Sequence, residues 1–190
     1  MKLMEEKILT KGRVLSGDIL KVDGFLNHQI DTDFLYEATG EIYRLFRDAK
    51  VTKIMTIEAS GIAVACLAAL YFHVPVVFAK KSTTSNMSPD VYRSTVESYT
   101  HRCGYEVTTA KAYLDASDRV LLVDDFLARG CALQCLLDIV GQAGATVVGC
   151  AVAIEKQYQG GGESLRAKGV RVEALAKIAA MDEKDGIRFC

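Results

Sequence analysis

The segment Val120–Ala132 constrains the fold of this chain more than any other part of its sequence. It opens with four consecutive aliphatic residues, Val120–Val123, which are typical of a strand buried on both faces of a parallel sheet. Asp124 and Asp125 follow, and the pattern predicts that the strand ends there. A loop over Phe126–Gly130 and then apolar residues at helical spacing come next, so the segment predicts a strand, a loop and a helix.

The same alternation of strands and helices recurs along the chain. Asp31 is a good N-cap for an amphipathic helix that extends to Arg47. Gly144 is expected to end the helix that follows Gly130. The polar stretch Lys80–Glu97 predicts a long surface loop. The other predicted elements are strands at Lys53–Ile57, Val74–Ala79, Thr146–Ile154 and Val170–Leu175, helices at Ile62–Phe72 and Glu163–Lys168, and edge strands or a hairpin at Tyr105–Thr109 and Lys111–Leu114.

This order of elements predicts an α/β fold in which a mainly parallel central sheet is flanked by helices. With no linker and no internal repeat, residues 1–190 are expected to form a single domain. Ligands of such sheets bind outside the carboxyl ends of the strands. The loops after Ile57, Ala79, Val123 and Ile154 are therefore the places where functional residues are expected.

Composition excludes several classes of function. The 23 basic and 24 acidic residues are balanced and form no long run of either sign, which argues against a nucleic-acid partner. The longest apolar stretch, Gly61–Phe72, is roughly half the ~20 residues of a membrane-spanning helix, so no membrane association is expected. Glu5 and Glu6 interrupt the region where a secretory signal is apolar, and a cytoplasmic protein is expected.

The cysteines and histidines give no sign of a metal or redox site. The six cysteines include no C-x-x-C pair and have no histidine at zinc-finger distance, so they are expected to be reduced thiols. The three histidines lie far apart in the sequence, and we assign them no role.

The residues that follow the central strand suit a phosphorylated sugar. Backbone N–H groups at a helix N-terminus bind phosphate when the neighbouring side chains are small, a condition that Ala128, Gly130 and Ala132 meet. Asp124 and Asp125 can accept hydrogen bonds from vicinal hydroxyls or help to hold magnesium. A single acid would suffice to end a strand and form a turn, so two adjacent acids before a small-residue turn favour a functional role.

The sequence VLLVDDFLARGCA resembles the phosphoribosyl pyrophosphate signature of the type I phosphoribosyltransferases. The resemblance extends over most of the chain, and within the family it is strongest to the bacterial purine salvage enzymes that act on xanthine. It implies a small N-terminal hood, formed by about residues 1–35 and the C-terminal segment, and a homodimer. The other segments that carry the resemblance are Leu15–Ile30, Lys53–Gly61, Val74–Lys81 and Val152–Gln157.

The resemblance also implies the chemistry and the site residues. Phosphoribose would be transferred from phosphoribosyl pyrophosphate to xanthine, with Mg2+ bound mainly through phosphoribosyl pyrophosphate and not by the protein alone. Asp124 and Asp125 would hold the ribose hydroxyls, and Lys81 would add a cation near pyrophosphate. The remaining implied contacts are Ala128, Arg129, Gly130, Cys131 and Ala132 with the 5'-phosphate, Glu58, Ala59, Ser60 and Gly61 with pyrophosphate, and Leu20, Asn27 and Lys156 with the base.

The chain departs from the family pattern at two positions of the phosphate loop. Arg129 stands where small or amide residues are commoner, and Cys131 where a hydroxyl or amide often helps to hold phosphate. Binding through backbone N–H groups is compatible with both changes. The segment Ser82–Arg102 is the poorest match.

Two alternatives remain open at this point. Hypoxanthine, guanine and adenine transferases share the sugar-phosphate signature, but the Lys156 ammonium has only hydrogen-bond donors and so favours an oxo-purine. A regulator that senses phosphoribosyl pyrophosphate has the same core and adds a DNA-binding domain. Here the sheet pattern begins by Lys53 after only a hood-like segment, and the charge is near neutral, so an enzyme is favoured.

Overall fold

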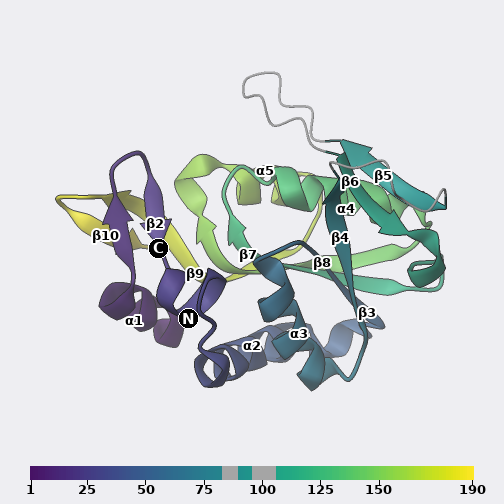
Figure 1. Cartoon of the computed structure of the whole chain (residues 1–190), viewed down its shortest axis with the longest axis horizontal. Helices are drawn as coiled ribbons and strands as arrows, with labels where there is room; N and C mark the ends of the chain where they lie inside the picture. The colour runs from purple at the N-terminus through teal and green to yellow at the C-terminus, as the bar shows by residue number, and fades with distance from the viewer. Residues whose placement is uncertain (83–89, 96–105) are drawn as a thin grey trace.

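The computed structural model describes residues 1–82, 90–95 and 106–190. Within these residues, an eight-stranded sheet has the strand order β10-β9-β8-β7-β3-β4-β6-β5 (Figure 1). No helix in this part of the chain is long and apolar enough to span a membrane. The strands are β3 (Lys53–Ile57), β4 (Val76–Ser82), β5 (Val91–Thr95), β6 (Glu106–Ala110), β7 (Arg119–Leu127), β8 (Thr146–Lys156), β9 (Val172–Asp182) and β10 (Gly186–Phe189).

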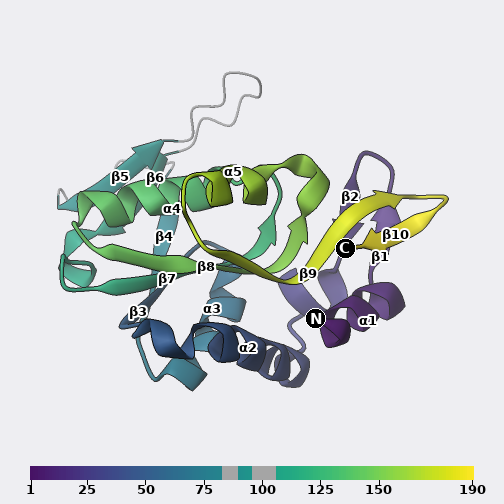
Figure 2. The ribbon, with the colours of Figure 1, turned by 180° about the vertical axis from the view of Figure 1, so that it is seen from behind.

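The centre of the sheet is parallel, as the sequence predicts. Strands β9, β8, β7, β3 and β4 pair in parallel, whereas β10 pairs antiparallel with β9, and β6 pairs antiparallel with both β4 and β5. Helices α2 (Thr32–Phe46) and α3 (Gly61–Phe72) cover one face of the sheet, and α4 (Cys131–Gln142) and α5 (Gly161–Ala167) cover the other (Figures 1 and 2). The predicted unit of strand, helix and parallel strand corresponds to β7, α4 and β8.

Strand β7 contributes to the hydrophobic core on both faces of the sheet. Leu121 and Val123 belong to the cluster that includes residues of α2 and α3, while Val120 and Leu122 belong to the cluster that includes residues of α4. All four side chains are fully buried. Successive side chains of a strand point to opposite faces, so an uninterrupted aliphatic run is what a strand covered on both sides requires.

The N-terminal region lies beside β9 and β10, at the end of the sheet toward which β8 runs (Figure 1). It contains α1 (Lys2–Lys11), the hairpin of β1 (Arg13–Leu15) and β2 (Ile19–Lys21), and a π-helical turn, Asp23–Asn27. Asp31 caps α2 by accepting a hydrogen bond from the Phe34 N–H at 3.2 Å, as predicted, and Lys7 of α1 donates to the same carboxylate at 2.6 Å. These contacts attach α1 to the start of α2.

The predicted end of the central strand at Asp124 and Asp125 is wrong. Strand β7 continues to Leu127, because its backbone remains paired with β8 beyond the acids, with Phe126 opposite Ile154 and Leu127 opposite Glu155. A carboxylate at the end of a strand does not interrupt the ladder, since its backbone still carries one donor and one acceptor.

The prediction of a continuous loop over Lys80–Glu97 is wrong where the structure describes it. Strand β4 extends to Ser82, and Val91–Thr95 form β5; both strands pair with β6. Residues 83–89 and 96–97 of the predicted loop lie outside the described part of the chain. Polar strands such as β5 give little apolar periodicity, so sequence reasoning missed this edge of the sheet.

The predicted edge pair before β7 is half correct. The first segment is a strand, β6, but it lies between β4 and β5 and is not an edge. The second segment is a 3-10 helix, Lys111–Tyr113.

Candidate active site

Asp124 and the start of α3 meet at the carboxyl ends of β3 and β7. Asp124 is 5% exposed, and its Oδ1 accepts a hydrogen bond from the Asp125 N–H at 3.0 Å. A Cβ added to Gly61 would lie 2.7 Å from Asp124 Oδ1 and would clash with Thr56 Oγ1, so glycine is required for this close approach. Thr56 Oγ1 is itself buried with no hydrogen-bond partner among the described residues.

The pKa of Asp124 is raised well above the ordinary value for aspartate. Burial is the main cause, and the negative charge of Asp125 adds to it, while the hydrogen bond from the Asp125 N–H and the charge of Lys81 act in the opposite direction. Ionisation of this carboxyl group is therefore energetically unfavourable in the ligand-free protein. A cation or hydroxyl donors placed beside it would relieve that cost.

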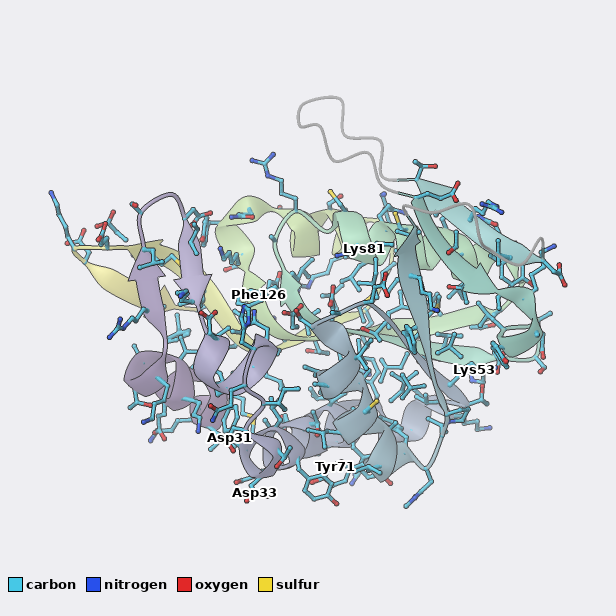
Figure 3. The ribbon with its side chains drawn as sticks, viewed as in Figure 1. Asp31, Asp33, Lys53, Tyr71, Lys81 and Phe126 are labelled. Atoms are coloured by element: carbon cyan, nitrogen blue, oxygen red, sulfur yellow. The ribbon has the colours of Figure 1, made fainter. Side chains whose placement is uncertain are left out.

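Glu58 and Lys81 connect the loop after β3 to the end of β4. The Glu58 carboxylate accepts a hydrogen bond from the Lys81 N–H at 2.7 Å, and the Glu58 N–H donates to the Ala79 carbonyl at 3.0 Å. The peptide bond between Glu58 and Ala59 is cis. Figure 3 shows Lys81 and Phe126 toward the middle of the molecule. Lys53, the first residue of β3, lies away from them.

The turn between β7 and α4 encloses a small cavity at a helix N-terminus. Helix α4 begins at Cys131, and its N-cap Gly130 has φ of +84°, in the left-handed region that favours glycine. The first N–H groups of such a helix have no intrahelical partner and carry a partial positive charge. The cavity, of about 280 Å3, is lined by Asp124, the residues from Phe126 to Leu133, and Gln159.

The backbone of α5 supports this turn from behind. The Gly161 N–H donates to the Ala128 carbonyl at 3.1 Å. A Cβ at Gly161 would lie 2.5 Å from the Arg129 carbonyl carbon and 2.6 Å from the Gly130 nitrogen. Only glycine at this position allows α5 and the turn to pack backbone against backbone.

A buried ion pair fixes α5 to β8. Arg166 donates two hydrogen bonds to Glu155, each of 2.7 Å, and a third to the Val172 carbonyl at 3.0 Å. The Glu155 side chain is fully buried, whereas one third of the Arg166 side chain is exposed. Gly162 is in contact with the same carboxylate, and any side chain there would collide with it.

Replacing Arg166 with methionine is expected to lower the free energy of unfolding by about 2–3 kcal/mol, because it leaves the buried Glu155 carboxylate without its partner. Partial solvation of the guanidinium places the expected loss below that of a completely buried pair. Chemical denaturation measures the change. The double variant Glu155→Gln with Arg166→Met should regain part of the stability; equal losses in both proteins would contradict this account.

The residues predicted to contact a base come from β8 and the N-terminal region. Lys156 Nζ donates to the Asp18 carbonyl at 2.6 Å and lies 6.0 Å from the centre of the Phe126 ring. Burial lowers the pKa of Lys156, and the charge of Asp18 opposes that shift. Leu20 is buried in the same apolar cluster against which Phe126 packs, and Asn27 Oδ1 is a buried acceptor with no partner among the described residues.

The structure thus brings the predicted residues together in two groups. The first group surrounds Asp124 on β7 and includes Gly61 after β3 and Lys81 on β4. Asp124 also lines the cavity formed by the turn before α4. The second group contains Lys156, which contacts Asp18 of the N-terminal region, and Leu20, which is buried in the apolar cluster against which Phe126 packs. Arg129 lines the cavity, and Cys131 is exposed at the first position of α4. The side-chain roles of these residues remain predictions.

Sequence reasoning missed four residues of these surroundings. They are Asp18, Phe126, Tyr158 and Gly161. The run Gly160–Gly162 was a usable signal, because consecutive glycines often mark a close approach of two backbones. Asp18 gave no signal, since its partners lie about 140 positions away in the sequence.

The family model and the most similar relatives that were compared are all phosphoribosyltransferases. The model of the phosphoribosyl transferase domain matches residues 28–173. Xanthine phosphoribosyltransferase of Lachnoclostridium phytofermentans is 49% identical over 186 residues, which are 98% of this chain and 96% of that protein. Xanthine phosphoribosyltransferase 1 of Clostridium perfringens is 50% identical over 184 residues, 96% of this chain and 97% of its own length.

Solved structures share the fold at lower sequence identity. Adenine phosphoribosyltransferase from Rhodothermus marinus superimposes with a TM-score of 0.76 at 21% identity and covers 93% of this chain and 98% of its own. The enzyme from Trypanosoma brucei gives a TM-score of 0.75 at 18% identity, covering 93% of this chain and 80% of its own. At such identities the likeness supports the fold alone.

Proposed function

Because this chain belongs to the phosphoribosyl transferase domain family, we propose that it transfers phosphoribose from phosphoribosyl pyrophosphate to xanthine. The products are xanthosine 5'-monophosphate and pyrophosphate, and the reaction belongs to purine salvage. The observation that carries the proposal is identity of about half the residues over nearly the whole chain to two xanthine phosphoribosyltransferases. The relatives are also covered almost completely, so the likeness is not confined to the sugar-phosphate segment.

We propose that the sugar and its phosphate occupy the carboxyl end of β7. Asp124 and Asp125 accept hydrogen bonds from the ribose hydroxyls, and Ala128–Ala132 bind the 5'-phosphate through backbone N–H groups at the start of α4. The cavity that these residues line, the positive φ of Gly130 and the burial of Asp124 support this placement. Arg129 adds a positive charge to the same cavity.

The pyrophosphate group is proposed to lie against the backbone of Glu58–Gly61, with the Lys81 ammonium beside it. The position of Lys81 supports this, because its charge lies close enough to Asp124 to lower the pKa of that carboxyl group, against the larger effect of burial. Negative charge that develops on the leaving pyrophosphate is stabilised by this preorganised cation and by the backbone dipoles. Loss of pyrophosphate leaves an oxocarbenium-like sugar that a purine nitrogen attacks from the opposite face.

The residues at this site fit a magnesium ion that arrives with the substrate. Among the described residues no group of three or more His, Cys, Asp or Glu side chains is arranged to hold a metal, but Asp124 and Asp125 are adjacent carboxylates. Magnesium in proteins is commonly bound by one or two carboxylates together with substrate phosphates. When bound, the ion supplies electrostatic stabilisation of phosphate charge; the acid pair holds and orients its ligands.

Base recognition is proposed to involve Leu20, Asn27 and Lys156. Lys156 has three N–H donors, of which one is given to Asp18, so donors remain for an oxo group of xanthine. Leu20 supplies apolar surface, and the buried Asn27 Oδ1, which lacks a partner among the described residues, can accept a hydrogen bond from a purine N–H.

We further propose that the enzyme acts in the cytoplasm as a homodimer.

Offering xanthine, guanine, hypoxanthine and adenine separately, each with phosphoribosyl pyrophosphate and Mg2+, is the direct test. The kcat/KM for xanthine is expected to exceed that for adenine by at least about 100-fold, because adenine presents an amino group to the Lys156 donors and leaves a buried hydrogen bond unmade. Release of pyrophosphate measures the rates. A preference for adenine would refute the base assignment, and no turnover with any purine would refute the function.

A further inference from the structure

Asp18 lies in the turn of the β1–β2 hairpin and makes three hydrogen bonds to the last residue of β8 and the short segment that follows it. Its backbone carbonyl accepts from Lys156 Nζ at 2.6 Å, Oδ1 accepts from the Tyr158 hydroxyl, and Oδ2 accepts from Gln159 Nε2. We call these three bonds the hairpin contact. The carboxylate thereby uses both oxygens on one short segment, and the main chain of the same residue holds the lysine.

The conformation of Asp18 makes this arrangement possible. Its φ is +65°, in the left-handed region, and it follows Gly17 at φ of +79°. Aspartate is one of the few residues other than glycine that tolerates this conformation. Apolar packing of the hairpin is limited to Leu20, the only buried residue in its two strands, and Val14, which is partly buried against the same core cluster.

The lysine that this contact holds is the residue proposed to recognise the base. A lysine side chain has several rotatable bonds, and ordering it costs up to about 2 kcal/mol of rotamer entropy. The bond to the Asp18 carbonyl and the packing near the Phe126 ring order the ammonium before any base arrives. An ordered donor loses less entropy when it binds a ligand, so affinity and discrimination both increase.

We propose that Asp18 is a positioning residue for base specificity, which holds the Lys156 ammonium and the 156–159 segment in the orientation that reads the oxo-purine. This inference rests on the proposed function, because Asp18 acts through Lys156 and does not itself contact the reacting atoms. Tyr158 and Gln159 join the hairpin to the end of β8, and Asp18 connects the hairpin to the lysine.

Two substitutions separate the parts of the contact. Asp18→Gly keeps the left-handed backbone and removes both side-chain bonds, so the KM for xanthine is expected to rise about tenfold. Asp18→Asn keeps one acceptor oxygen and should raise that KM about threefold. In both variants kcat and the KM for phosphoribosyl pyrophosphate should change less than twofold. The ratio of kcat/KM for xanthine to kcat/KM for hypoxanthine should fall. Ser16→Ala, in the same turn, is the matched control and should leave all values unchanged.

A double-mutant cycle with Lys156→Gln shows whether Asp18 acts through the lysine. Once Lys156 is replaced, Asp18→Gly is expected to raise the KM for xanthine by less than twofold further, since the group that it positions is gone. Independent, multiplicative effects would overturn the proposal. So would an unchanged KM for xanthine in Asp18→Gly, or equal rises in the KM of both substrates, which would indicate a general loss of structure.

The same measurements distinguish this inference from the proposed function. If wild-type enzyme uses xanthine best and Asp18→Gly retains its KM, the positioning role fails while the function stands. If the wild-type enzyme prefers another purine, the base assignment fails, and the cycle is then measured with that purine. A selective, nonadditive rise in its KM would support the positioning role, and additive effects would overturn it.

Discussion

Enzyme in which Asp124 and Asp125 are both replaced by asparagine is expected to lose about 10³-fold in kcat/KM while remaining folded. Each carboxylate is proposed to accept charge-assisted hydrogen bonds from the sugar, and such bonds contribute about 1.5–3 kcal/mol each. Two of them amount to roughly 10²–10⁴-fold in rate, since 1.4 kcal/mol is a factor of ten. Steady-state kinetics with saturating xanthine measures the loss. Activity within tenfold of wild type would remove the acid pair from the mechanism.

The stability of the single variant Asp124→Asn separates lost chemistry from lost structure. The folded protein raises the pKa of Asp124, mainly through burial, so the ionised carboxylate destabilises the fold above that pKa and not below the ordinary value for aspartate. Asparagine removes this penalty. Its gain in the free energy of unfolding is therefore expected to be near zero at pH 3, below the ordinary pKa of aspartate, and to increase as the pH rises to 8.

Asp48→Asn is the matched control for both measurements, because the Asp48 side chain is 96% exposed. The same chemical change there should alter neither activity nor the pH dependence of stability. Thermal or urea unfolding at the two pH values provides the comparison. A loss of stability in Asp124→Asn that increases with pH would contradict the assigned direction of the pKa.

Gly161→Ala is expected to raise the KM for phosphoribosyl pyrophosphate about 100-fold, although Gly161 belongs to none of the proposed substrate contacts. The added methyl group would lie 2.5 Å from the Arg129 carbonyl carbon and 2.6 Å from the Gly130 nitrogen, so the turn before α4 must move. Displacement of backbone donors from a phosphate weakens charge-assisted hydrogen bonds directly. The KM for xanthine should rise less, because the added methyl group collides with the turn before α4, which carries none of the residues proposed to contact the base.

Gly141→Ala provides the control for this second substitution. Gly141 lies in α4 with nothing within 4 Å of an added Cβ, so alanine is expected to raise the free energy of unfolding by about 0.5–1 kcal/mol without affecting either KM. An unchanged KM for phosphoribosyl pyrophosphate in Gly161→Ala would show that the turn does not depend on α5. Direct binding of the substrate, measured by calorimetry, checks the kinetic result.

The parts of the fold that the sequence predicts well are those with strong local periodicity. The boundaries of β3 agree with its predicted range, and α2 starts after its predicted N-cap, Asp31, and ends one residue before the predicted Arg47. The β1–β2 hairpin, β5 and β10 were not predicted, because short strands with exposed side chains have no apolar period of their own. Their pairing with distant strands determines them.

The candidate site divides in the same way. Asp124, Asp125 and the turn before α4 are consecutive in the chain, so spacing and residue type were enough to select them. The contacts of Asp18 and Gly161 arise from tertiary packing, where the relevant property is distance in space. The raised pKa of Asp124 also depends on burial, which an acidic dipeptide in a sequence does not specify.

Strand β7 packs in the hydrophobic clusters on both faces of the sheet, whereas the β1–β2 hairpin does not. The two sides of the candidate site are therefore expected to differ in local stability. Opening the strand that carries the acid pair would expose apolar layers on both faces, so its amide protons are expected to exchange only through global unfolding. The β1–β2 hairpin exposes few apolar groups when it separates and can open alone. With the base and the pentose placed as proposed above, local fluctuation opens the base side of the site while the pentose side stays ordered.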